Sequence, residues 1–167
     1  RIKAALGLKE YVILGHPVGG AMAVEMGVSD PDCLAVITIA AQAFVEERTL
    51  DGIRVAKELF QQDGQIEKLE RWHGDKSRWV LDAWTDTWLN PNFKNWNLTA
   101  ALNSLKSPVL AIHGEQDEYG SVAFPQYISD QSSGFCEQVI IPNCAHNPHR
   151  TDEDLVLGCI KQFLETN

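Results

Sequence analysis

The sequence has no apolar run long enough to cross a membrane, and its first residues lack the pattern of a secretory signal peptide. It is also poor in positive charge, with 14 lysines and arginines against 23 aspartates and glutamates and a net charge of -9. Nucleic acids and anionic membranes bind basic surfaces. We therefore expect neither as a partner.

The sequence contains few cysteines, and their spacing matches no common motif. The chain has four cysteines, Cys33, Cys136, Cys144 and Cys159, and no two of them form a C-x-x-C pair. Buried, reduced thiols of this kind are typical of cytosolic proteins, so we expect a cytoplasmic location. Cys144, His146 and His149 could be read as metal ligands, but their spacing fits no standard zinc pattern. We expect no metal and no cofactor.

The length and composition are those of a soluble globular domain. The 167 residues include 44% hydrophobic and 22% charged residues, which is enough apolar material for a core. The first residue is Arg1 rather than methionine. We therefore expect the chain to be a processed product or a fragment of a longer protein.

Four short apolar segments predict the strands of one sheet. They are Tyr11–Leu14, Leu34–Ala41, Val109–Ile112 and Gln138–Ile141. Each is followed by a helical pattern, as Tyr11–Leu14 is by Val18–Met26. Strands that alternate with helices form parallel sheets with right-handed crossovers. The fold class is therefore α/β, with a parallel sheet flanked by helices.

Residues 45–105 have a different character, because strand signals stop and helical periodicity takes over. This segment contains all five tryptophans, Trp72, Trp79, Trp84, Trp88 and Trp96. We interpret it as a helical cap inserted into a core made of residues 1–44 and 106–167. The rings fit the core of such a cap. Some of them, with Trp84 and Trp88 as candidates, would also line an apolar substrate pocket.

The first strand leads into Gly15-His16-Pro17-Val18-Gly19-Gly20, a sharp turn before a helix. Strand, turn and helix in this order are the context of the nucleophile elbow, G-x-S-x-G, with proline where that motif has serine. Asp117 follows the strand at Val109, and His146 follows the strand at Gln138. Carboxyl ends of parallel strands meet at one edge of a sheet. We therefore expect Asp117 and His146 within hydrogen-bond distance, near the turn at Pro17.

These three motifs, in this order, resemble the C-terminal part of the α/β-hydrolase superfamily. The elbow is similar to the family's G-H-S-x-G-G. Val109-Leu110-Ala111-Ile112-His113-Gly114-Glu115-Gln116-Asp117 is similar to the segment that delivers the acid. Asn143-Cys144-Ala145-His146-Asn147 resembles the histidine loop, with alanine where glycine is usual. The resemblance covers the whole chain and implies the last four strands of the family's sheet.

The resemblance implies a role for each position of the site. Pro17 occupies the nucleophile position, Asp117 that of the acid and His146 that of the base. The Val18 N–H is the oxyanion donor that remains, because the family's other donor loop belongs to the N-terminal half. His16 is expected to line the pocket. The family hydrolyses esters and related acyl compounds through an acyl-enzyme. The resemblance therefore implies a small molecule as substrate or ligand.

Proline at position 17 removes the attacking atom, because it has no hydroxyl. Its φ, held near −65°, is also unlike the strained conformation of an elbow nucleophile, so we expect a relaxed turn. No other nucleophile replaces it, since His16 is expected to point elsewhere and Cys33 lies beyond the following helix. We therefore expect the chain as written to be inactive in serine-hydrolase chemistry.

Two alternatives to a hydrolase or its inactive variant stay open. One is a non-catalytic binding or scaffold protein that keeps the pocket. The other is general-base chemistry by Asp117 and His146 without a covalent step. Taken alone, Asp117 could be a solvated acidic loop residue and His146 an ordinary loop histidine. Their positions after the two strands favour a functional interpretation.

The Tyr11–Leu14 strand is expected to have an open edge. We predict four parallel strands in sequence order, which leaves one side of Tyr11–Leu14 without a neighbour. The resemblance implies that this side is covered by the missing N-terminal half. A second copy of the chain is the other candidate. We favour the N-terminal half, because parallel sheets need helices on both faces.

Overall fold

The structure, a computed structural model, describes residues 2–167, so Arg1 lies outside the described residues. It divides into two compact units. One contains residues up to Ala43 together with Asn97–Asn167, and the other is Phe44–Trp96. The sheet lies entirely in the first unit.

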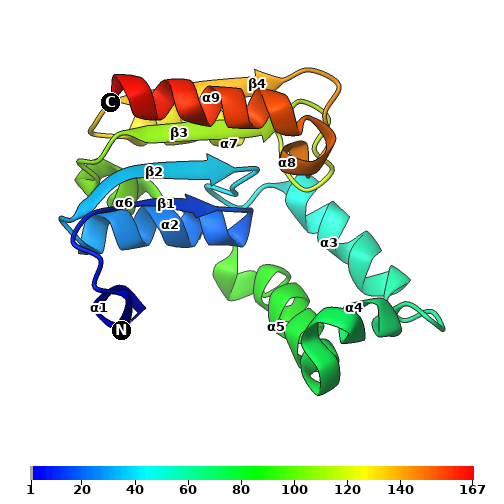
Figure 1. Cartoon of the computed structure of the whole chain (residues 1–167). Coiled ribbons are helices and arrows are strands. Elements are labelled where there is room, and N and C mark those ends of the chain that lie inside the picture. The colour runs from blue at the N-terminus through cyan, green and yellow to red at the C-terminus, as the bar shows by residue number, and fades with distance from the viewer. Residues whose placement is uncertain (1) are drawn as a thin grey trace. The chain divides into compact units, whose positions relative to one another are not determined.

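The first unit is built on a four-stranded parallel sheet (Figure 1). Its strands are β1 (Tyr11–Gly15), β2 (Cys33–Ile39), β3 (Val109–Gly114) and β4 (Cys136–Ile141), and they lie in the order β1-β2-β3-β4. All three pairings are parallel. The predicted fold class, strand order and direction are confirmed.

Helix α9 (Glu153–Thr166) covers one face of this sheet. Side chains alternate between the two faces along a strand. On β2, the residues Ala35, Ile37 and Ile39 share a buried cluster with Val156 and Phe163 of α9. Leu110, Ile112 and Ile141 from the next two strands belong to the same cluster.

Helices α2 (Val18–Ser29), α6 (Thr99–Ser104) and α7 (Ala123–Gln131) cover the opposite face, where α6 contacts both α2 and α7. Gly27 of α2 lies directly against Val36, which points away from the α9 face. A Cβ at Gly27 would overlap the Val36 and Leu105 side chains, so glycine allows α2 to approach the sheet. Figure 1 shows α2 and α9 on opposite sides of the strands.

Two short helices complete the first unit. Helix α1 (Ile2–Leu6) precedes β1, and Lys3 forms an ion pair of 2.8 Å with Asp30 beyond the end of α2. Helix α8 (Pro148–Thr151) follows the loop after β4. None of the helices within residues 2–167 combines the length and the apolarity needed to cross a membrane.

The second unit is helical. It contains α3 (Glu47–Leu59), α4 (Ile66–His73) and α5 (Ser77–Trp88), with short 3-10 helices at Gly74–Lys76 and Pro91–Phe93. Ile53 and Leu81 are buried, and Trp88 packs edge-on against Phe93 and Trp96. The sequence predicts a cap over 45–105. The compact helical unit spans 44–96, and its role as a cap stays a prediction.

The segment after Trp96 belongs with the sheet. The Leu98 N–H donates to the Ala43 carbonyl at 2.9 Å, and Leu98, Leu102 and Leu105 are fully buried. Helical periodicity alone assigns α6 to the preceding helical segment. Packing against α2 places it in the first unit.

Candidate active site

The turn between β1 and α2 is tight and unstrained. Pro17 has φ −67° and ψ −52°, which is ordinary helical backbone, and this agrees with the relaxed turn expected from proline. The N–H groups of Gly19 and Gly20 donate to the carbonyls of His16 and Pro17 at 3.2 and 3.0 Å. A Cβ at Gly15 would overlap the Gly19 carbonyl, so this turn requires glycine there.

Val18 is the first residue of α2. N–H groups in the first turn of a helix have no acceptor within the helix, so they are available to an anionic oxygen. The position of Val18 is therefore compatible with the oxyanion role implied by the resemblance. That role stays a prediction.

The loop after β3, which carries Asp117, is hydrogen-bonded to the end of β4 and to the loop that follows it. The N–H of Gln116 donates to the Cys144 carbonyl at 2.8 Å, and that of Glu115 donates to the Ile141 carbonyl at 3.0 Å. Gly114 lies so close to this second loop that a Cβ would overlap the Ala145 carbonyl. These contacts hold Asp117 close to His146, which follows Ala145.

Asp117 and His146 form a buried hydrogen-bonded pair, as the sequence predicts. The His146 Nδ1 lies 2.9 and 2.8 Å from the Asp117 Oδ1 and Oδ2 atoms. Carboxylate oxygens accept, so Nδ1 donates, and Nε2 of the neutral ring carries the lone pair. Oδ1 also accepts from the Tyr119 N–H at 2.8 Å. The His113 Nε2 is 3.5 Å from Oδ2 and donates to the Gly120 carbonyl at 3.2 Å.

The backbone of His146 is held from both sides. Its N–H donates to the Glu118 Oε2 at 3.3 Å, and its carbonyl accepts from the His16 Nε2 at 2.9 Å. The Tyr119 ring meets the His146 ring edge-on, with 4.9 Å between the centroids. His16 precedes Pro17 directly, so this hydrogen bond joins the elbow to the histidine loop.

His16 lies between two other imidazoles. Its ring centroid is 4.9 Å from that of His146 and 4.6 Å from that of His149. Burial, together with the neighbouring imidazoles, lowers the pKa of His16, and its hydrogen bond to the His146 carbonyl only partly opposes this. Burial, the charge of Arg150 and His146 lower the pKa of His149. Both rings are therefore neutral at neutral pH.

Other ionisable groups near the pair resist ionisation. Burial, with the negative charges of Glu118 and Asp117, raises the pKa of Tyr119. Burial also raises the pKa of the Cys144 thiol, whose Sγ lies 3.4 Å from the Thr151 Oγ1. A buried thiol with a raised pKa is a poor nucleophile, so Cys144 is not a candidate nucleophile for this site.

A metal site finds no support in the part of the chain that the structure describes. Residues 2–167 contain no group of three or more histidine, cysteine, aspartate or glutamate side chains placed to hold a metal ion. Of the three residues that the sequence allows as ligands, Cys144 contacts Thr151 and His146 contacts Asp117.

The structure brings together His16, Asp117 and His146, with Pro17 next to His16. Trp84 and Trp88 belong to the other unit, in which Trp88 lies in the aromatic core. Their contribution to a substrate pocket stays a prediction. Sequence reasoning missed Glu118 and Tyr119 as neighbours of His146. Their place directly after Asp117, in a strand-end loop, was the available signal.

Comparisons with known proteins agree on the fold. No family model and no curated protein matches the chain. Among solved structures, a membrane phospholipase A described as a bacterial virulence factor is similar, with TM-score 0.76 and 16% identity over 99% of this chain. The α/β hydrolase MGS-M2 from a deep-sea metagenome library is also similar, with TM-score 0.70 and 17% identity over 98%. The esterase RhEst1 from Rhodococcus sp. ECU1013 has TM-score 0.71 and 16% identity over 98%.

The chain is shorter than these proteins. It spans 60% of the phospholipase chain and 68% of the MGS-M2 and RhEst1 chains. At these identities the likeness shows the fold, and it shows that this chain carries part of it.

Proposed function

We propose that this chain, which has the α/β-hydrolase fold, derives from serine hydrolases of esters or related acyl compounds and lacks their covalent step. The observation that carries the proposal is the hydrogen bond between His146 and the buried Asp117. It sits beside a turn in which Pro17 stands where such hydrolases have serine.

The pair has the parts of a general base. With its Nδ1–H directed at Asp117, the His146 ring is fixed in one tautomer, and Nε2 accepts a proton. The carboxylate then stabilises the imidazolium that forms. In a serine hydrolase that proton comes from the serine hydroxyl. Pro17 has none, and removing the nucleophile of a triad costs about 10⁶ in turnover.

We propose the substrate class of this chain by analogy with the similar solved proteins. The solved structures include an esterase and a phospholipase A, both named for cleaving esters. An ester or related acyl compound is therefore the ligand that we propose for this fold. Because Pro17 has no hydroxyl, the chain would bind such a ligand without forming a covalent bond to it.

A second candidate function is direct activation of water by the Asp117–His146 pair. The observation that favours it is that the pair is complete and oriented although the nucleophile is absent. A water that gives its proton to Nε2 attacks the acyl carbon as hydroxide, and no acyl-enzyme forms. A binding or scaffold protein would not need this arrangement.

The test combines a covalent probe with a turnover assay on the 167-residue chain. A fluorophosphonate probe, which labels activated serines, should leave the chain unlabelled. Stoichiometric labelling that disappears in His146→Ala would overturn the proposal. Hydrolysis of p-nitrophenyl acetate that is lost in both His146→Ala and Asp117→Asn would support water activation. Equal rates of hydrolysis in the unmodified chain, His146→Ala and Asp117→Asn would exclude catalysis by the pair and favour a binding function.

A further inference from the structure

The segment after β2 carries a buried amide with an unused acceptor. Gln42 is only 5% exposed, and within residues 2–167 its buried Oε1 atom has no hydrogen-bond partner. Positions 40, 41 and 43 are alanines, so Gln42 is the only residue of this segment with a polar side chain. A buried polar atom without a partner costs free energy, because folding removes it from water without replacing the lost hydrogen bond. Such an atom is a candidate contact for a ligand.

The backbone just before Gln42 is strained. Ala40 has a φ of 51°, in the left-handed region that residues with a Cβ seldom adopt. The Ala40 N–H donates to the Ile112 carbonyl of β3 at 2.8 Å. Beyond Gln42, the Ala43 carbonyl accepts from the Leu98 N–H at 2.9 Å. The segment is therefore held at both ends, and strained residues that are held in this way gather at binding and catalytic sites.

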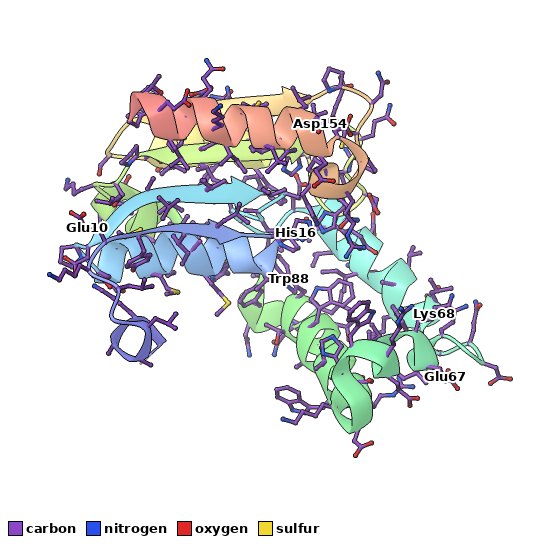
Figure 2. The ribbon with its side chains drawn as sticks, in the orientation of Figure 1. Glu10, His16, Glu67, Lys68, Trp88 and Asp154 are labelled. Atoms are coloured by element: carbon purple, nitrogen blue, oxygen red, sulfur yellow. The ribbon has the colours of Figure 1, made fainter. Side chains whose placement is uncertain are left out.

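This segment lies beside the elbow. Strand β2 lies between β1, which leads to the elbow, and β3, which leads to Asp117. Ala41 packs against the first turn of α2, where a Cβ at Gly20 would lie 2.5 Å from the Ala41 Cβ. Figure 2 shows His16 at the edge of the sheet where β2 also ends. Gln42 therefore belongs to the same end of the sheet as the candidate site.

We propose that Gln42 contacts the ligand of this site, with its Oε1 atom accepting a hydrogen bond from an O–H or N–H group of the bound acyl compound. This inference rests on the proposed function, which supplies the acyl compound, and it narrows the ligand class to acyl compounds with such a donor, for example hydroxy esters. Because Oε1 makes no hydrogen bond in the free chain, the amide turns toward a ligand without breaking one.

An acceptor without a partner discriminates between ligands of similar shape. A hydroxy ester pairs its O–H with the Gln42 carbonyl, whereas the matching methyl ether leaves that atom buried and unpaired. The hydroxy ester should therefore bind more tightly, although both ligands present the same acyl group to the rest of the site.

The first test compares methyl lactate with methyl 2-methoxypropionate, which differ in one O–H donor. NMR titration of the 167-residue chain with each ester gives two dissociation constants, and we expect methyl lactate to bind about threefold to tenfold more tightly. In Gln42→Met the two affinities should become equal, because methionine has no carbonyl in its side chain. Gln62→Met, at an exposed position, is the matched control and should keep the preference.

The outcomes of this titration separate the inference from the proposed function. Equal affinities in the unmodified chain, or a preference that survives in Gln42→Met, would overturn the inference and leave the proposed ligand class intact. Absence of binding for both esters would overturn the ligand class and the inference together.

The second test measures thermal stability without a ligand. Gln42→Met replaces the unpaired acceptor by an apolar side chain of similar length, so the melting temperature should rise by about 2 °C or more. Gln62→Met should leave it unchanged. A lower melting temperature for Gln42→Met would show that the Gln42 amide is hydrogen-bonded in the free chain, and it would overturn the inference.

Discussion

The imidazole Nδ1 of His146 lies 2.8 Å from a carboxylate oxygen of Asp117, although the two residues are 29 positions apart in the sequence. The loops after β3 and β4 hold this distance through the contacts of Gly114 and Gln116. The Asp117 carboxylate is fully buried, and it also accepts from the Tyr119 N–H. The pair is therefore part of the core as well as of the candidate site.

Asp117→Ala should destabilise the protein because it leaves the buried His146 Nδ1–H and the part-buried Tyr119 N–H without their acceptor. Each unsatisfied donor costs roughly 1–3 kcal/mol, so we expect a loss of about 2 kcal/mol or more in the free energy of unfolding. Urea denaturation measures it. Asp63→Ala, at an exposed position, should change stability by about 0.5 kcal/mol or less. Equal effects of the two substitutions would show that the pair is not structural.

Gly15→Ala and Gly19→Ala should have opposite effects although both glycines belong to the elbow. A Cβ at Gly15 overlaps the Gly19 carbonyl, so alanine there must distort the turn and should lower stability by more than about 2 kcal/mol. A Cβ at Gly19 meets nothing within 4 Å, and alanine in a helix should raise stability by about 0.5–1 kcal/mol. Thermal melts of the two variants compare them directly. Similar melting temperatures would contradict this description of the turn.

Stability should fall as the pH drops below neutrality. The folded-state pKa values of His16 and His149 lie below the ordinary 6.5, so the unfolded chain takes up protons that the folded chain excludes. Stability is then unaffected above pH 6.5 and declines as the pH falls from 6.5 toward the folded-state values. Urea unfolding of the unmodified chain and of His149→Gln at pH 7.5 and 5.5 tests this. The variant should lose less stability, and identical losses would exclude His149 as a cause.

The sheet could be predicted because its signals are local. Tyr11–Leu14 and Val109–Ile112 are short apolar runs bounded by turn residues, and the resemblance to the α/β-hydrolase superfamily implies their order. The geometry of a parallel sheet brings Asp117 and His146 together, since both follow strand ends. The packing around them could not be predicted, because Glu118 and Tyr119 reach His146 through the path of one loop.

The boundary of the helical unit could not be predicted for a related reason. Thr99–Ser104 has the same helical period as the preceding segment, and only its packing against α2 assigns it to the sheet unit. The role of the tryptophans could not be predicted from the sequence either. An aromatic ring in an amphipathic helix fits a core or a pocket equally well, and Trp88 packs against Phe93 and Trp96.

The central claim of the proposed function is that His146 and Asp117 act as base and acid and that the nucleophile at position 17 is absent. The most direct measurement is the rate of fluorophosphonate labelling of Pro17→Ser, compared with the unmodified chain and with Pro17→Ser/His146→Ala. Because residue 17 follows His16, which donates to the His146 carbonyl, we predict covalent labelling of Pro17→Ser alone, at a rate at least about tenfold above the double variant. Labelling of Pro17→Ser that is no faster than that of the unmodified chain, or that survives His146→Ala, would contradict the account.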